Sequence, residues 1–455
     1  MKKFWNGKEI SERNLVDLIR ECTENNWKNS DLFRETEIAC EIIAFENYEG
    51  REEDIECIIE KLKGDGATLF DLENAIQNGE WYFMQTETWK KNIRKGECEM
   101  KNIKFELTEN TINWEDRTLY QIKACKAFVT NSGVEVSEGE LGGWIEKEEN
   151  LSQEGSAWVW KDSKVWGDAK VSENALIWGD IKISGNAQIG GNAQIWGDAQ
   201  IGGNAKVYED AEIYGYVKVS GDSEISGNAE ISGNSKVCED AKISGNAKIF
   251  GNAEISGNAK ISGDAKVFGN AEIWDNAEIS GNSKVFGNAK VCGNSKISDY
   301  AEIYGNAEVW NDAKVWEDAK VWEGAVVRDN AEVSGETKIF GYAVIKGNAK
   351  VAGKATIYGD SEVWGDAIIT GCSKVFGDAK IGGDAFISSP DNLLTITPLG
   401  KYRVSLTLFK TKNNSIKASY NWDIYTLEKF QSIMSDWTEK EIKIAKAAIE
   451  ILGGC

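Results

Sequence analysis

Residues 241–270 read AKISGNAKIFGNAEISGNAKISGDAKVFGN, which is five copies of one six-residue pattern. Each copy has an alanine, a lysine or glutamate, an isoleucine or valine, one variable residue, and a closing Gly-Asn or Gly-Asp. A charged residue between two apolar ones is typical of a short strand with one buried face. Gly, Asn and Asp tolerate the positive φ angles of tight turns. Each copy therefore predicts one short strand and one corner.

The same pattern continues from Ala157 to Pro390. Isoleucine or valine occupies position 159 and every sixth position through Ile387, which makes 39 consecutive hexads with no insertion. Such repeats predict a solenoid whose coils stack about 4.8 Å apart through backbone hydrogen bonds. Burial of each isoleucine or valine contributes roughly 1.5–3 kcal/mol, which offsets the entropy of ordering the chain.

The residue after each isoleucine or valine indicates how many hexads form one coil. Every third such residue from position 160 is aromatic in twelve of thirteen cases, and Ser232 is the exception. The sets that start at positions 166 and 172 are mixed or mostly small. A period of 18 predicts three strands per coil, and therefore a three-sided prism of about thirteen coils. The twelve aromatic residues, called the aromatic ladder below, are Trp160, Trp178, Trp196, Tyr214, Phe250, Phe268, Phe286, Tyr304, Trp322, Phe340, Tyr358 and Phe376.

The hexads resemble those of the left-handed parallel β-helix proteins, whose best-known members are acyltransferases. The resemblance implies a left-handed coil. The segments 117–120 (RTLY) and 141–152 (LGGWIEKEENLS) resemble the lead-in of uncharacterised hexapeptide-repeat proteins of phages and prophages. This resemblance implies a phage or prophage origin and a β-helix, and it brings no known activity.

A looser resemblance to the C-terminal module of the same family extends the match to about residues 101–455. It rests on the segments 408–412 (LFKTK) and 427–430 (LEKF). The strand that is rich in cysteine in that module reads ASYNW at residues 418–422 here.

The flanking segments predict three further parts. Residues 1–100 show helical spacing of apolar residues and predict an α-helical domain, and residues 101–156 predict a β cap that leads into the solenoid at residues 157–390. Residues 391–455 predict a small α/β module. Within this module we expect a hairpin around Asn413-Asn414 and a helix that runs from a Thr438–Glu441 capping box to Gly453.

Composition excludes several classes of partner. The net charge is −22, from 74 acidic and 52 basic residues, which disfavours non-specific binding to nucleic acid and to anionic membranes. The nine cysteines are scattered and form no CxxC pair, as expected for free thiols in a reducing compartment. No apolar run is typical of a signal peptide or a transmembrane segment. We expect the protein in the cytoplasm of a host cell or in a virion.

The sequence predicts no enzyme. The β-helix acyltransferases that it resembles use a histidine as general base and form pockets from loops between coils. This chain has no histidine, and its hexads contain no inserted loop. The corner Asn and Asp residues, among them Asp162, Asp168 and Asn174, suit turns better than calcium sites because they face solvent and do not converge. We therefore expect no catalytic residue, no metal and no cofactor.

The aromatic ladder is the sharpest candidate for a binding feature, and three interpretations of it remain. Flanking domains or a second subunit cover it, or sugars or another partner stack on its rings, or the rings mainly shield the coils by stacking on each other. We expect a structural or protein-interaction protein, a rigid rod that binds another protein or itself through the ladder or the helical head. The alternatives are a virion appendage or glycan-binding fibre and, more distantly, an acyltransferase-like enzyme.

Overall fold

The computed structural model describes residues 4–5, 8–9, 103–400 and 402–453. The predicted helical domain of residues 1–100 thus lies outside the described residues, except for two short strands, β1 (Phe4–Trp5) and β2 (Lys8–Glu9), which pair antiparallel. Five of the cysteines also lie outside them: Cys22, Cys40, Cys57, Cys98 and Cys455.

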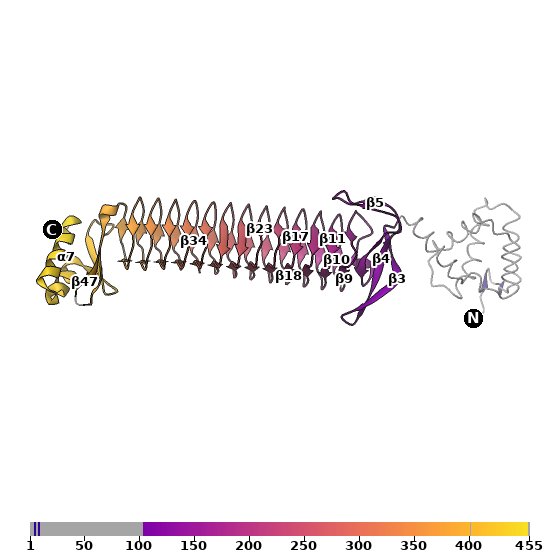
Figure 1. Cartoon of the computed structure of the whole chain (residues 1–455), viewed down its shortest axis with the longest axis horizontal. Helices are drawn as coiled ribbons and strands as arrows, with labels where there is room; N and C mark the ends of the chain where they lie inside the picture. The colour runs from indigo at the N-terminus through magenta and orange to yellow at the C-terminus, as the bar shows by residue number, and fades with distance from the viewer. Residues whose placement is uncertain (1–3, 6–7, 10–102, 401, 454–455) are drawn as a thin grey trace. The chain divides into compact units, whose positions relative to one another are not determined.

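The 39 hexads form 39 strands, β8 (Trp158–Val159) to β46 (Phe386–Ile387), as the sequence predicts. Each strand begins one residue before the isoleucine or valine of its hexad, and 34 of the 39 end on that residue. Five strands extend two residues further: β11 (Leu176–Gly179), β14 (Gln194–Gly197), β17 (Glu212–Gly215), β26 (Lys266–Gly269) and β29 (Lys284–Gly287). Every third strand belongs to the same parallel sheet, so three sheets form the sides of a solenoid (Figure 1).

The core of the solenoid consists of the alanine and the isoleucine or valine of each hexad. Ala247 and Ile249, for example, are fully buried, while Lys248 between them points outward and is partly exposed. At the corners, glycines stack directly on glycines of the next coil. Gly179 has a φ of +109°, and a Cβ atom there would lie 2.3 Å from the Gly197 carbonyl oxygen. Glycine at this corner is therefore required by both backbone angle and space.

The solenoid begins earlier than the hexads alone predict. Strand β7 (Leu141–Ile145) pairs in parallel with β9 (Lys164–Val165), and Leu151 forms a parallel bridge with Val171. Ile145 and Val165 are 20 residues apart, whereas later coils repeat every 18 residues. One sheet consequently contains fourteen parallel strands from β7 to β45 (Lys380–Ile381), and the solenoid has about 14 turns against the predicted thirteen coils.

Short elements precede this first coil. Strands β3 (Phe105–Trp114) and β4 (Arg117–Ala124) precede β7 in the order of the same sheet, and β5 (Phe128–Val129) and β6 (Glu135–Val136) form a two-stranded sheet. The 3-10 helix η2 (Glu148–Asn150) follows β7. Residues 101–156, for which the sequence predicts a β cap, thus contain strands β3 to β7 and η2.

The C-terminal module begins with η3 (Pro390–Asn392) and contains a four-stranded antiparallel sheet: β47 (Leu393–Leu399), β48 (Val404–Lys410), β49 (Ile416–Tyr420) and β50 (Asp423–Thr426). Helix α6 (Leu427–Ile433), η4 (Met434–Asp436) and helix α7 (Glu439–Ile451) follow the sheet. The hairpin and the final helix are confirmed, including the capping box in which Thr438 and Glu441 bind each other's backbone N–H groups. The outer strands and α6 complete the module around a core that includes Phe430 and Trp437.

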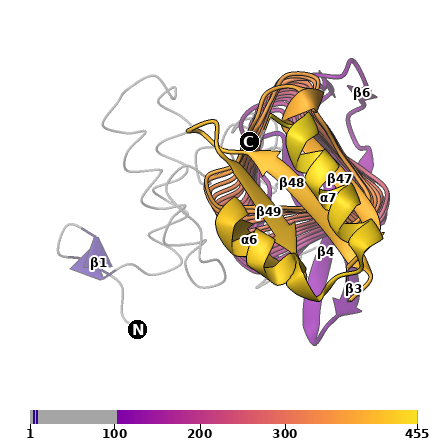
Figure 2. The same cartoon turned by 90° about the vertical axis from the view of Figure 1, so that its left-hand side faces the viewer.

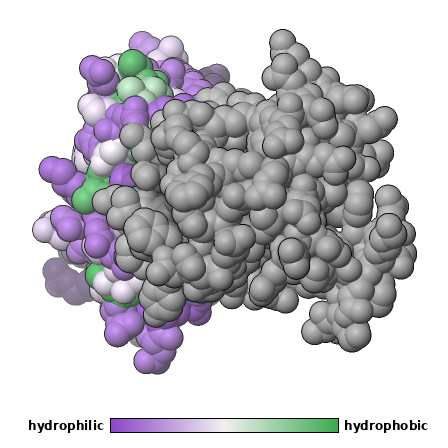
Figure 3. Space-filling view, turned by 90° about the vertical axis from the view of Figure 1, so that its right-hand side faces the viewer, coloured by the Kyte–Doolittle hydropathy of each residue, from purple (hydrophilic) through white to green (hydrophobic). Residues whose placement is uncertain are grey.

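Figure 2 views the solenoid along its length and shows this module across the last coil. Figure 3 shows the described surface from the opposite direction, where hydrophilic residues predominate and hydrophobic ones are separated.

Candidate functional site

The aromatic ladder follows the strands of one sheet, and its rings stack face to face from coil to coil. The centroids of consecutive rings lie 4.5–5.6 Å apart, with interplanar angles of 1–19°. One run joins Trp178, Trp196 and Tyr214, and a longer run extends from Phe250 to Phe376. Trp160 meets Trp158 edge to face, with centroids 6.5 Å apart. Face-to-face stacking along the two runs is the arrangement expected if the rings mainly shield the coils by stacking on each other.

Burial shows which part of each ring remains accessible. Most ladder residues are half-buried, because each face within a run is covered by the neighbouring ring. Phe250, next to the break at Ser232, is 37 % exposed, and Phe376, the last ring, is 48 % exposed. A partner at this surface would therefore contact ring edges along the runs. Sugar stacking on a ring face needs a free face, which the geometry leaves only at the ends of the two runs.

The corner asparagines form hydrogen-bonded ladders, in addition to their predicted role in turns. The amide nitrogen of Asn234 donates to the side-chain oxygen of Asn252 at 3.1 Å, and Asn252 donates in turn to Asn270 at 2.9 Å. Several such ladders end on an aspartate, as Asn246 does on Asp264 at 2.8 Å. A carboxylate only accepts hydrogen bonds, so it stops the relay of amide donors. The position of each aspartate thus decides where a ladder ends.

Acidic residues replace glycine at several corners where φ is positive. Glu239, for example, has a φ of 61°, and its carboxylate accepts the backbone N–H of Gly257 in the next coil at 2.7 Å. Glu323 does the same for Gly341 at 2.8 Å. These hydrogen bonds offset the strain of a side chain in the left-handed region.

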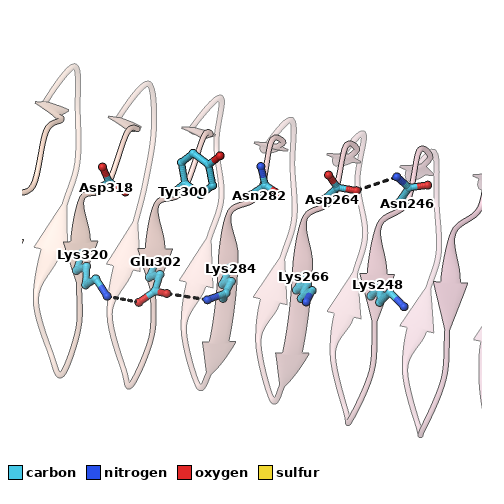
Figure 4. Close-up of a pocket in the computed structure, with 10 residues that line it drawn as sticks. All are labelled: Asn246, Lys248, Asp264, Lys266, Asn282, Lys284, Tyr300, Glu302, Asp318 and Lys320. Carbon is cyan, nitrogen blue, oxygen red and sulfur yellow. Dashed lines mark hydrogen bonds and ion pairs between the residues drawn. The ribbon is translucent and has the colours of Figure 1, made fainter.

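A shallow groove of ≈ 520 Å³ crosses five coils beside the ladder (Figure 4). One wall is a column of outward side chains, which includes Lys248, Lys266 and Lys284, and the other wall is a column of corner residues. The three lysines lie directly opposite one another in neighbouring strands: β23 (Lys248–Ile249), β26 and β29. Like charges in this register are destabilising, so Lys266 is flanked by a repelling lysine on each side.

Further along the groove, charges are paired. Glu302 lies 2.9 Å from the Lys284 ammonium and 2.8 Å from that of Lys320. Burial opposes the charged form of Glu302, but the hydrogen bonds from the two lysines outweigh it and lower its pKa. The hydrogen bond to Glu302 raises the pKa of Lys320. Glu302 and its two lysines therefore form a triad of paired charges in this part of the groove.

The C-terminal module contacts the last coil through specific pairs. Ala385 forms an antiparallel bridge with Thr411, and the Lys417 ammonium lies 2.7 Å from the Asp384 carboxylate. Gly382 leaves room for Ile424 of the module, because a Cβ atom at residue 382 would lie 2.3 Å from the Trp364 ring and 2.8 Å from Ile424. The module thus covers strand edges that the predicted solenoid would leave open.

Metal-ligand side chains and cysteine thiols are the remaining candidate groups among the described residues. Among them, no group of three or more Cys, Asp and Glu side chains is arranged to hold a metal ion. Cys238, Cys292 and Cys372 are free thiols, and burial raises the pKa of Cys238 and Cys292, which lowers their nucleophilicity at neutral pH. Of the helices in the described part, none has the length and apolar character needed to cross a membrane.

Sequence reasoning placed the aromatic ladder but missed the groove. Lysine recurs at positions 248, 266 and 284, which are 18 residues apart. This recurrence was the sequence signal that could have revealed the groove. Which side-chain donors of the groove have no hydrogen-bond partner among the described residues depends on side-chain rotamers. The sequence does not contain that information. Comparisons of the chain with models of protein families and with curated proteins find no match.

Proposed function

We propose that this protein is a non-enzymatic rod of phage or prophage origin that acts as a structural or protein-interaction scaffold. In this proposal the solenoid holds its terminal parts at a set separation and presents the aromatic ladder to another protein or to a second copy. The phage origin rests on the resemblance of residues 117–120 and 141–152 to phage-encoded hexapeptide-repeat proteins.

The observation that carries the scaffold proposal is the unbroken stack of coils, with a ladder of rings along one corner and a module across one end. Each coil contacts its neighbours through the same backbone register, so bending requires many hydrogen bonds to change together. A long stiff element with few loops is suited to holding terminal parts apart and to presenting the ladder. The fold itself does not specify a chemical activity.

Site-specific photo-crosslinking on the full chain tests this proposal. A photoreactive amino acid replaces Phe286 on the ladder, and in a matched control it replaces Ser280 on another side of the same coil. We expect crosslinks to a discrete protein, or to a second copy, from position 286 and not from 280. Equal crosslinking from both positions, or turnover of acyl-CoA by the purified chain, would overturn the proposal.

The second candidate is a virion appendage or glycan-binding fibre. The exposed edges of the ladder and its free terminal faces favour it, because flat apolar surfaces suit sugar rings. Co-purification of the protein with intact particles, at a constant ratio through a density gradient, supports this candidate. Recovery in the particle-free fraction alone would exclude it.

A further inference from the structure

The groove contains side-chain hydrogen-bond donors for which the described residues supply no acceptor. Lys248 and Lys284 each have a carboxylate partner, Glu230 and Glu302, on the sides away from Lys266. Lys266 lies between these two lysines and is exposed. Throughout the part of the chain that the structure describes, no carboxylate lies within ion-pair distance of its ammonium.

Two neutral side-chain donors line the groove beside Lys266, and the corner ladder explains why neither has a partner in the described part of the chain. Asp264 accepts from Asn246 and ends that ladder, and the following corner residue is Asn282. The next corner after Asn282 is Tyr300, which cannot continue an amide ladder. Among the described residues, neither the Asn282 amide nor the Tyr300 hydroxyl forms a side-chain hydrogen bond. Tyr300 is 60 % exposed, and its ring lies among the corner residues of the groove (Figure 4).

These groups define the chemistry of a ligand. The cation and two neutral donors call for an acceptor with negative charge. The carboxylates of Asp264 and Asp318 also line the groove, and they would repel a polyanion such as nucleic acid while accepting hydrogen bonds from hydroxyl groups. The exposed face of Tyr300 suits a sugar ring. We propose that this groove binds a saccharide that carries a carboxylate, with the carboxylate on Lys266 and hydroxyl groups on Asn282 and the aspartates.

This inference goes beyond the scaffold role and does not depend on the aromatic ladder. A rod that spaces two partners works with or without a sugar in this groove, so the two proposals fail separately. The groove is shallow and the ion pair is exposed to solvent, so we expect weak binding that salt suppresses.

Ligand-observed saturation-transfer NMR on the full chain tests the site. The probes are trigalacturonate, a glucuronate-containing disaccharide and sialyllactose, each compared with its neutral methyl ester. We expect at least one acid to bind saturably and its ester to bind at least tenfold more weakly. We also expect Lys266→Gln to weaken binding of the acid at least tenfold. Tyr300→Ala should also weaken binding of the acid.

Lys206→Gln is the matched control, because Lys206 is likewise exposed and, in the described part of the chain, has no carboxylate partner, but it lies on another sheet. We expect it to leave binding unchanged. Thermal unfolding of Lys266→Gln should match or exceed that of the natural chain, since the substitution removes repulsion between lysines. Absence of binding by all three acids, equal binding of acid and ester, or equal effects of the two lysine substitutions would overturn the proposal.

Discussion

At the scale of single residues, the corners show how one position serves backbone and side chain together. Gly179 is required because it has a positive φ and because the next coil leaves no space for a Cβ atom. Glu239 occupies an equivalent corner with a side chain, and its carboxylate compensates by accepting the Gly257 N–H. The hexad pattern therefore tolerates acidic residues where it otherwise needs glycine, because a carboxylate can bind across to the next coil.

Ser232 provides a direct test of ring stacking. Ser232→Phe would place a ring between Tyr214 and Phe250 and join the two runs of the ladder. Each stacked pair adds about 0.5–1.5 kcal/mol beyond area burial, so we expect higher resistance to guanidinium chloride. Ser244→Phe is the control, because Ser244 lies in a column whose neighbours, Ser226 and Ser262, offer no ring. Equal stabilisation by the two variants would show that added apolar area, rather than stacking, is responsible.

Carboxylates between lysines predict a pH dependence. Hydrogen bonds from Lys296 and Lys350 lower the pKa of Glu278 and Glu332, respectively. A folded pKa below the unfolded value contributes stability that is present above the unfolded pKa and is lost as pH falls through the folded pKa. We therefore expect a constant thermal midpoint from pH 7 to about pH 5, and a decline below about pH 4.5. Replacement of both glutamates by glutamine should reduce that decline, as measured by scanning calorimetry; an unchanged decline would assign it to other carboxylates.

At the scale of elements, the junction between the last coil and the C-terminal module depends on close packing. The module meets the solenoid through an isolated bridge between Ala385 and Thr411, and Trp422 lies beneath the Lys380 ammonium, which is 4.4 Å from its ring centroid. Neither contact repeats along the rod. The junction is therefore specified by particular side chains, whereas coil-to-coil contacts are specified by the repeat.

Gly382→Ala tests this junction. The added Cβ atom would overlap the Trp364 ring and Ile424, and relief of such overpacking costs about 1–3 kcal/mol. We expect faster hydrogen exchange in β49 and β50, with unchanged exchange in the central coils. Gly202→Ala is the matched control in the same column, where a Cβ atom would meet only the Ser184 hydroxyl at 3.2 Å. Equal exchange in the two variants would show that the junction accommodates the methyl group.

At the scale of the whole solenoid, stability is a sum over coils, and the ends are its weak points. Terminal coils have unpaired strand edges that invite pairing with another chain. The C-terminal module covers one such end, and β7 with η2 forms an irregular first coil at the other. These elements distinguish a rod of defined length from an open stack.

Removal of the C-terminal module tests its role as a cap. A chain that ends at Ser388 would expose β45 and β46, and we expect association that increases with protein concentration, measured by light scattering coupled to size exclusion. The control is the full chain at the same concentrations. Substitution of Ile368 and Ile369 by lysine is not a suitable control, because Ile369 is buried. A monomeric truncated chain would show that the last coil needs no cover.

The sequence by itself determined the repeat architecture. A six-residue pattern with an 18-residue recurrence admits few structures, because alternation defines the inward face and glycine defines the corners. The aromatic ladder, the C-terminal hairpin and the capped final helix followed from equally local rules. Local rules suffice where each residue interacts mainly with its equivalents one coil away.

Only the tertiary structure decided the features that interrupt this repetition. The 20-residue first coil, the outer strands of the C-terminal module and the contact at Gly382 arise from packing between segments with different sequences. The groove belongs to the same class, because the particular partners of Asn246, Lys248 and Lys284 leave Asn282 and Lys266 without a side-chain partner among the described residues. Partner choice among several equivalent side chains depends on geometry in three dimensions, which the linear pattern does not contain.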